Sequence, residues 1–133
     1  MNQQNHVQQI EGVLRQYEAA LNTSDTESIV PLYTGDGVFM PQHSPAQIGI
    51  EAVETAYRTV FQMLKLNVTF TIHEVQVIND DYAFARTSSQ GTQVLLAENL
   101  SSDEYNNELF VFRQVADSWK IARYLFATAN PPR

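Results

Sequence analysis

The chain has 133 residues, of which 44% are hydrophobic, and it contains no cysteine. This length and composition fit one folded domain spanning residues 1–133 and exclude wholesale disorder, disulfides and a thiol nucleophile. The formal net charge is −7, which argues against binding to nucleic acid or to an anionic membrane surface, because both require clustered positive charge. No apolar run approaches the ~20 residues that span a bilayer. The chain begins with a polar stretch rather than a secretory signal, so we expect a cytoplasmic protein.

Three helices are predicted in the first half of the chain. Apolar side chains recur every three or four residues over 7–21, which predicts an amphipathic helix. Ser24 and Glu27 have the spacing of a capping box, which predicts a second helix, and Pro31 stops it early. A third amphipathic stripe covers residues 50–64.

The remaining segments predict strands and turns. Residues 33–37 have the composition of a turn, 38–40 form a short strand, and a proline-containing loop follows up to residue 49. Residues 67–77 alternate with period two, but the alternation changes parity near His73, which predicts a bulge. The next strand is predicted over 82–97, with a kink at its glycine.

The end of the chain is predicted to be a long hairpin. Two apolar runs within residues 108–127 flank a tight polar turn at 116–118, and the polar stretch 99–107 before them has the composition of a loop. Together the segments predict an α+β fold in which four long antiparallel strands form a curved, cone-shaped sheet wrapped around the N-terminal helices. A hollow between sheet and helices is a common ligand site.

One set of motifs runs through the first half of the chain: Tyr17-x-x-Ala20, Asp25, Ile29-x-x-Leu32-Tyr33, Asp36-Gly37-Val38-Phe39, Gly49-x-Glu51-Ala52-Val53 and Tyr57. In these residues the sequence resembles the SnoaL-like branch of the nuclear-transport-factor-2-like superfamily. The ending, Asn107 to Arg113 and Trp119 to Phe126, is most similar to the small proteins grouped as SgcJ/EcaC-type or DUF4440. The resemblance implies a pocketed cone that is usually a homodimer through its outer sheet face. It leaves the activity open, because this superfamily contains isomerases, cyclases, hydrolases, dehydratases and binding domains.

Ketosteroid isomerase, a distant member, allows a comparison by position. Its oxyanion tyrosine and supporting tyrosine correspond to Tyr17 and Tyr57. Its general base falls at Met40 or Pro41, and its second oxyanion donor falls near Phe110. None of these last three side chains can take or give the required proton, so the resemblance argues against ketosteroid isomerase activity.

Arg86 and Glu108 are the most informative charged pair. If Phe84 and Phe110 face the hollow, strand parity places Arg86 and Glu108 there too, and buried charges must be paired or hydrogen-bonded. They then form a structural ion pair, or Arg86 holds an anionic or carbonyl ligand while Glu108 acts as a base or orients the ligand. The opposite parity would direct both side chains to a dimer interface.

The predicted ligand-binding set combines these residues with apolar side chains expected in the hollow. It comprises Tyr17, Met40, Tyr57, Phe61, Phe84, Arg86, Glu108, Phe110 and Tyr124, with Tyr17 and Glu108 as candidates for catalysis. His43 lies in the loop near the expected mouth, where it is either a proton shuttle or simply solvated. His6 falls in a start expected to fray. The three histidines lack metal-ligand spacing and no nucleotide motif is present, so we expect no metal and no cofactor.

Three functions are compatible with this sequence. The first is a homodimer that binds a small, mostly apolar molecule and performs cofactor-free acid–base chemistry on a carbonyl or polycyclic compound. The second is a non-catalytic accessory module that binds without reacting. The third is a protein-interaction domain that uses its sheet face.

Overall fold

The computed structural model describes residues 3–131, which form three helical segments at the start, one later helix and six strands. In chain order the elements are α1 (Gln3–Asn22), α2 (Thr26–Ile29), the 3-10 turn η1 (Val30–Leu32), β1 (Tyr33–Met40), β2 (Gln47–Ile48), α3 (Ile50–Met63), β3 (Leu64–Val77), β4 (Tyr82–Leu95), β5 (Leu100–Val115) and β6 (Ser118–Thr128). No helix among the described residues is long and apolar enough to cross a membrane.

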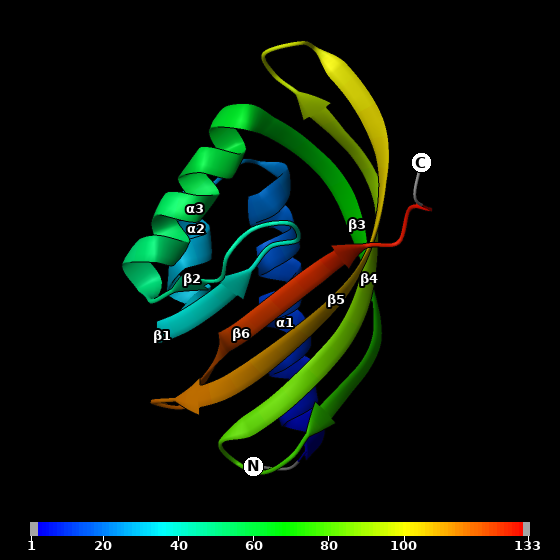
Figure 1. The fold of residues 1–133 in the computed structure, drawn as a ribbon. Helices are drawn as coiled ribbons and strands as arrows, with labels where there is room; N and C mark the ends of the chain where they lie inside the picture. Colours follow the sequence, from blue (N-terminus) through cyan, green and yellow to red (C-terminus); the bar gives the residue numbers. More distant parts are fainter. Residues whose placement is uncertain (1–2, 132–133) are drawn as a thin grey trace.

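The six strands form one open, curved sheet in the order β2-β1-β6-β5-β4-β3. Neighbouring strands are antiparallel except β1 and β6, which are parallel. The helices lie on the concave side of the sheet, with α1 inside the curve (Figure 1). A register shift between Ile72 and Glu74 is the predicted bulge, and a second occurs between Val111 and Phe112. Bulges increase local twist, which bends the sheet around α1. The α+β cone is thus confirmed.

Two segments predicted as irregular are strands instead. Residues 33–37 belong to β1, and Tyr33 pairs with Ile121 of β6. Residues 100–107 continue β5 and pair with β4 up to the Leu95–Leu100 rung, so the turn lies at 96–99, where Asn99 has a φ of 51°. Both segments are rich in turn-forming residues, but backbone hydrogen bonds to a neighbouring strand override local propensity. The short strand β2 was also not predicted.

The second helix starts one residue later than the capping box implies. Asp25, not Ser24, is the N-cap, and its carboxylate accepts the Ser28 backbone N–H at 3.1 Å. Ser24 has a φ of 54° and follows the end of α1, a left-handed position typical of a helix C-terminus. Ser24 therefore belongs to the turn that follows α1, and the cap of α2 falls on the next residue, Asp25.

The free edge of β3 is covered by polar side chains of α1. The Asn22 side chain both accepts from the Val68 N–H at 2.8 Å and donates to the Val68 carbonyl at 2.9 Å. One turn earlier, Glu18 accepts the Phe70 N–H at 2.7 Å and Arg15 donates to the Phe70 carbonyl at 2.9 Å. These side chains replace the missing neighbouring strand, which protects an edge that would otherwise be free to pair.

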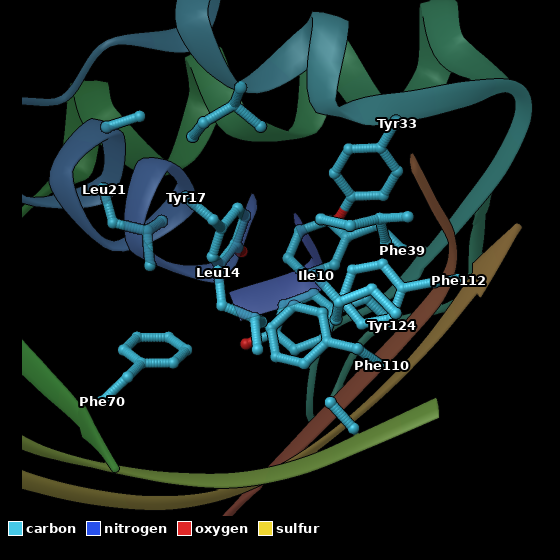
Figure 2. Close-up of a cluster of buried hydrophobic side chains, with 14 of the residues drawn as sticks. Ile10, Leu14, Tyr17, Leu21, Tyr33, Phe39, Phe70, Phe110, Phe112 and Tyr124 are labelled. Carbon is cyan, nitrogen blue, oxygen red and sulfur yellow. The ribbon is translucent and has the colours of Figure 1, made fainter. Parts of the chain in front are cut away.

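The core is strongly aromatic (Figure 2). Tyr124 stacks on Phe110 with centroids 4.1 Å apart, and Tyr17 packs edge-on against both rings. At the other end of α1, His6 is buried and accepts a hydrogen bond from the Trp119 indole N–H to Nδ1 at 3.0 Å. The expectation that His6 frays is therefore wrong, because Trp119 of β6 anchors the first turn of α1.

Candidate functional site

A cavity of about 360 Å³ lies between the concave face of the sheet and helices α1 and α3. Its wall combines side chains of α1, α3 and strands β1 and β3 to β6, and residues 41–44 of the β1–β2 loop lie at its rim. The volume is at the lower end of the range that holds small organic ligands. It lies between the sheet and the helices, where the sequence predicts a hollow, and buried aromatic side chains fill the rest of the cone.

Three tyrosine hydroxyls form a hydrogen-bonded chain beside this cavity. The Tyr57 hydroxyl lies 2.6 Å from the Tyr17 hydroxyl and 2.6 Å from the Tyr33 hydroxyl. Tyr17 and Tyr57 line the cavity. Burial raises the pKa of all three phenols above the ordinary value of 10.0. They are therefore neutral near pH 7, and a chain of neutral hydroxyls can pass a donated hydrogen bond to an acceptor in the cavity.

Glu108 projects from β5 into the same cavity. Its two carboxyl oxygens accept hydrogen bonds from the hydroxyls of Thr87, at 2.7 Å, and Ser89, at 2.5 Å. Burial raises the pKa of Glu108, while these two hydroxyl bonds act in the opposite direction. The negative charge of Glu108 in turn adds to the effect of burial in raising the pKa of Tyr17 and of Tyr124.

The rest of the cavity wall divides into a polar and an apolar side. The polar side comes from the inward faces of β4 and β5 and consists of Ser89, Gln93, Glu104, Asn106 and Glu108. The apolar side comes from α1, α3, β1, β3 and β6. In the described part of the chain, residues 3–131, no Lys or Arg side chain lines the cavity. A wall of this kind is complementary to a ligand that is mostly apolar and has a polar group at one end.

The structure gathers four of the nine predicted ligand-binding residues at the cavity. These are Tyr17, Tyr57, Glu108 and Tyr124. The other five lie elsewhere: Phe110 is fully buried beneath Tyr124, Phe61 packs beside the Tyr57 ring, Met40 is half-buried at the end of β1, and Phe84 and Arg86 lie on the outer face. Whether any of them binds a ligand stays a prediction.

The predicted Arg86–Glu108 pair is wrong. The Arg86 guanidinium bonds the Glu74 carboxylate at 2.8 Å, and its side chain is 57% exposed. Glu108 pairs across the sheet with Thr87, whereas Arg86 pairs with Leu109 on the outer face. The inward face of β4 consists of the small residues Ala83, Ala85, Thr87 and Ser89. The error arose because Phe84 suggested the inward parity, although the aromatic core leaves room only for small side chains on this strand.

Sequence reasoning missed the groups that orient the two candidates. Tyr33 was part of the family motif, but nothing in its local pattern indicated that it would bond Tyr57. Thr87 and Ser89 alternate along β4 with Ala83 and Ala85, a small-residue pattern that does mark one face. The Asn106 amide donates to the Ser89 hydroxyl at 3.4 Å and extends the polar wall. Among residues 3–131, no three potential metal ligands gather at one point.

Comparison with known proteins agrees with this architecture. Residues 13–124 match the SnoaL-like domain family, and the chain belongs to it. The chain is similar to a ketosteroid isomerase-like protein from Erwinia carotovora atroseptica SCRI1043, with 30% identity and a TM-score of 0.92 over 98% of this chain and 100% of that one. No curated protein matches the chain in sequence.

Two further solved structures share the fold at lower identity. One is a nuclear transport factor 2 (NTF2-like) superfamily protein from Salmonella enterica subsp. enterica serovar Typhimurium str. LT2, with 14% identity, a TM-score of 0.81 and coverage of 93% of this chain and 91% of that one. The other is an uncharacterised protein with a cystatin-like fold from Caulobacter vibrioides, with 17% identity, a TM-score of 0.78 and coverage of 94% and 90%. At these identities the likeness concerns the fold alone.

Proposed function

We propose that the protein binds a small, mainly apolar carbonyl compound in the cavity and acts on it by acid–base chemistry without a cofactor. One observation carries this proposal: the Tyr17 hydroxyl and the Glu108 carboxyl, a neutral donor and a potential base, lie on the same apolar cavity. A hydrogen bond from Tyr17 to the carbonyl oxygen stabilises the negative charge that develops there.

The proposed chemistry is a proton transfer next to the carbonyl. The Glu108 carboxylate takes a proton from the carbon beside the carbonyl, and the electron pair of that C–H bond moves toward the carbonyl oxygen, which accepts a hydrogen bond from Tyr17. The carboxylic acid then returns the proton to the same carbon or to a conjugated one. The raised pKa of Glu108 supports the role, because a base works best when its pKa approaches the operating pH.

The test uses 2-acetylnaphthalene, a neutral aromatic ketone. NMR titration measures its binding, and exchange of its methyl protons in heavy water measures proton abstraction. Glu108→Gln should retain binding and lose the enzyme-dependent exchange, whereas Glu74→Gln, which removes a carboxylate from the outer face, should retain both. Equal exchange in Glu108→Gln and the unmodified protein would show that Glu108 is not the base. Failure of the ketone to bind would contradict the proposed ligand class.

A second candidate is a binding module without catalysis. The observation that favours it is the position of the ketosteroid isomerase base, which is taken by Met40 or Pro41. Glu108 also already accepts two hydroxyl hydrogen bonds, which weaken a base. In this case the ketone binds but its methyl protons exchange no faster than in buffer, and native mass spectrometry should detect a co-purified ligand.

We also propose that the outer sheet face forms a homodimer interface. Leu109 and Leu125 are directly opposite each other on β5 and β6 and are 43% and 45% exposed. Tyr105 continues this patch along β5 and is 49% exposed. Exposed apolar side chains next to one another commonly mark protein contacts, and the family resemblance implies that relatives pair through this face. A role in recruiting another protein would use the same surface.

A further inference from the structure

Glu104 is a second carboxyl group on the cavity wall, and the proposed mechanism does not use it. Glu104 and Glu108 share the inward parity of β5, and both line the cavity. Four residues along a strand separate their backbones by about 13 Å. Glu104 is half-buried, and burial raises its pKa. The cavity therefore has an acidic group at each of two positions along its length.

Neither carboxyl group is neutralised by a basic side chain. Within residues 3–131, the ion pairs involve other carboxylates, and no Lys or Arg lines the cavity. Among the described residues, the one histidine on the wall is His43, an exposed residue of the β1–β2 loop. The polar contacts of Glu108 are all with uncharged groups: its carboxyl oxygens meet the hydroxyls of Thr87 and Ser89, and Ser89 in turn accepts from the Asn106 amide.

Such a wall discriminates between ligands by charge. A carboxylate or phosphate on the ligand would meet two like charges in a partly desolvated site, where repulsion is weakly screened. A protonated amine would instead supply the missing positive charge. The aromatic rings of Phe39, Tyr57, Tyr124 and Phe126 on the same wall add attraction for a cation and contact area for an apolar body.

We propose, on the basis of the function proposed above, that the ligand is an apolar ketone with a protonated amine at its far end, and that Glu104 binds this amine. The carbonyl then lies at Tyr17 and Glu108, and the ammonium group lies farther along the strand direction, where the flexible side chain of Glu104 reaches it. Glu104 is a specificity-determining residue in this arrangement, since it contacts the ligand away from the reacting carbon.

The test compares three ketones that differ only in one charged group. They are 2-acetylnaphthalene, its 6-aminomethyl derivative and its 6-carboxylate derivative, each titrated by NMR at low ionic strength. The amine should bind roughly tenfold tighter than the neutral ketone, and the carboxylate should bind more weakly than it. The preference should shrink as salt is added, because salt screens partly exposed charges.

Two variants that change the net charge equally test whether Glu104 itself causes the preference for the amine. Glu104→Gln should lose most of the amine preference while it still binds the neutral ketone. Asp103→Asn, the adjacent exposed residue of β5 on the opposite face, should retain the preference. Thermal unfolding of both variants confirms that they fold.

The outcomes separate this inference from the proposed function. If the neutral ketone binds but the amine gains nothing, or if Glu104→Gln and Asp103→Asn behave alike, the inference fails and the proposed function stands. If the carboxylate binds best, the charge argument is overturned. If none of the three ketones binds, the proposed function fails and this inference fails with it.

Discussion

Asn22 at the end of α1 hydrogen-bonds both backbone groups of Val68 on β3, at 2.8 and 2.9 Å. Val68 is an edge residue and also lines the cavity. A single side-chain amide thus joins the end of α1 to the edge of β3, next to the contacts that Arg15 and Glu18 make with Phe70. An amide suits this position because it offers one donor and one acceptor.

Replacement of Asn22 should weaken the contact between α1 and the edge of β3. Asn22→Ala leaves the N–H and the carbonyl of Val68 without their partner, and we expect a loss of about 1–3 kcal/mol in the free energy of unfolding. Asn22→Asp keeps an acceptor but directs a carboxylate at the Val68 carbonyl, so it should also destabilise. Urea denaturation measures both. An unchanged midpoint in both variants would show that water replaces the amide without loss.

Because Tyr57 is the central hydroxyl of the chain, its replacement should lower the free energy of unfolding more than replacement of Tyr33. Tyr57→Phe removes both 2.6 Å contacts, whereas Tyr33→Phe removes one and keeps the Tyr17–Tyr57 contact. We expect a loss of about 1–3 kcal/mol for Tyr57→Phe and a smaller loss for Tyr33→Phe, because buried hydroxyls without partners are costly. Urea denaturation of the two variants and of their double mutant measures the order. A larger loss for Tyr33→Phe would contradict the bridging role.

The raised pKa of Glu108 predicts a pH dependence of stability. Above the ordinary value of 4.5, the unfolded chain loses the proton of Glu108 before the folded chain does, so the folded state binds more protons and stability falls as pH rises. The fall occurs between 4.5 and the higher folded-state pKa. Glu108→Gln should lose this component of the pH profile, as measured by urea denaturation from acidic to neutral pH.

Glu74 provides a control of opposite sign. The bond from Arg86 lowers the pKa of Glu74 below 4.5. Its contribution is therefore present above 4.5 and is lost as pH falls through the folded-state pKa. Identical pH profiles for Glu74→Gln and Glu108→Gln would contradict the different environments of the two carboxyl groups.

Two glycines should respond in opposite ways to alanine. Gly91 has a φ of 157°, and an added Cβ would collide with the Asn67 carbonyl oxygen and lie 2.8 Å from the Val68 Cα. Both are backbone atoms, so Gly91→Ala should destabilise by at least about 1 kcal/mol. Gly12 lies in α1 with nothing within 4 Å of an added Cβ, so Gly12→Ala should stabilise by about 0.5–1 kcal/mol. Thermal unfolding compares the two, and a stable Gly91→Ala would contradict the close approach of β3 and β4.

The proposed dimer can be tested at one position. Leu109→Glu places a charge in the centre of the outer apolar patch and should convert a dimer to a monomer, measured as molar mass by light scattering. Ile78→Glu is a control, because Ile78 is 63% exposed but lies in the β3–β4 turn. A monomeric unmodified protein, or a dimer that tolerates Leu109→Glu, would contradict an interface on this face.

Residue patterns along the chain predicted the helices, the long strands and the bulge near His73. These features follow from local periodicity, since a helix or a half-buried strand must repeat its apolar side chains at a set interval. The same reasoning placed Glu108 on one face of its strand with Phe110 and Phe112, but it left open whether that face points into the hollow or toward a dimer interface. The family resemblance added the two tyrosines at positions 17 and 57.

The sequence by itself thus determined the α+β cone and which residues share a face of each long strand, because both depend on side-chain period within one element. Only the tertiary structure decided which face of β4 points inward, and it placed Thr87 and Ser89, not Arg86, beside Glu108. It also decided that residues 100–107 form a strand and that Tyr33 joins Tyr57. These features depend on register and packing between segments far apart in the chain, and a one-residue change of register exchanges the two faces of a strand.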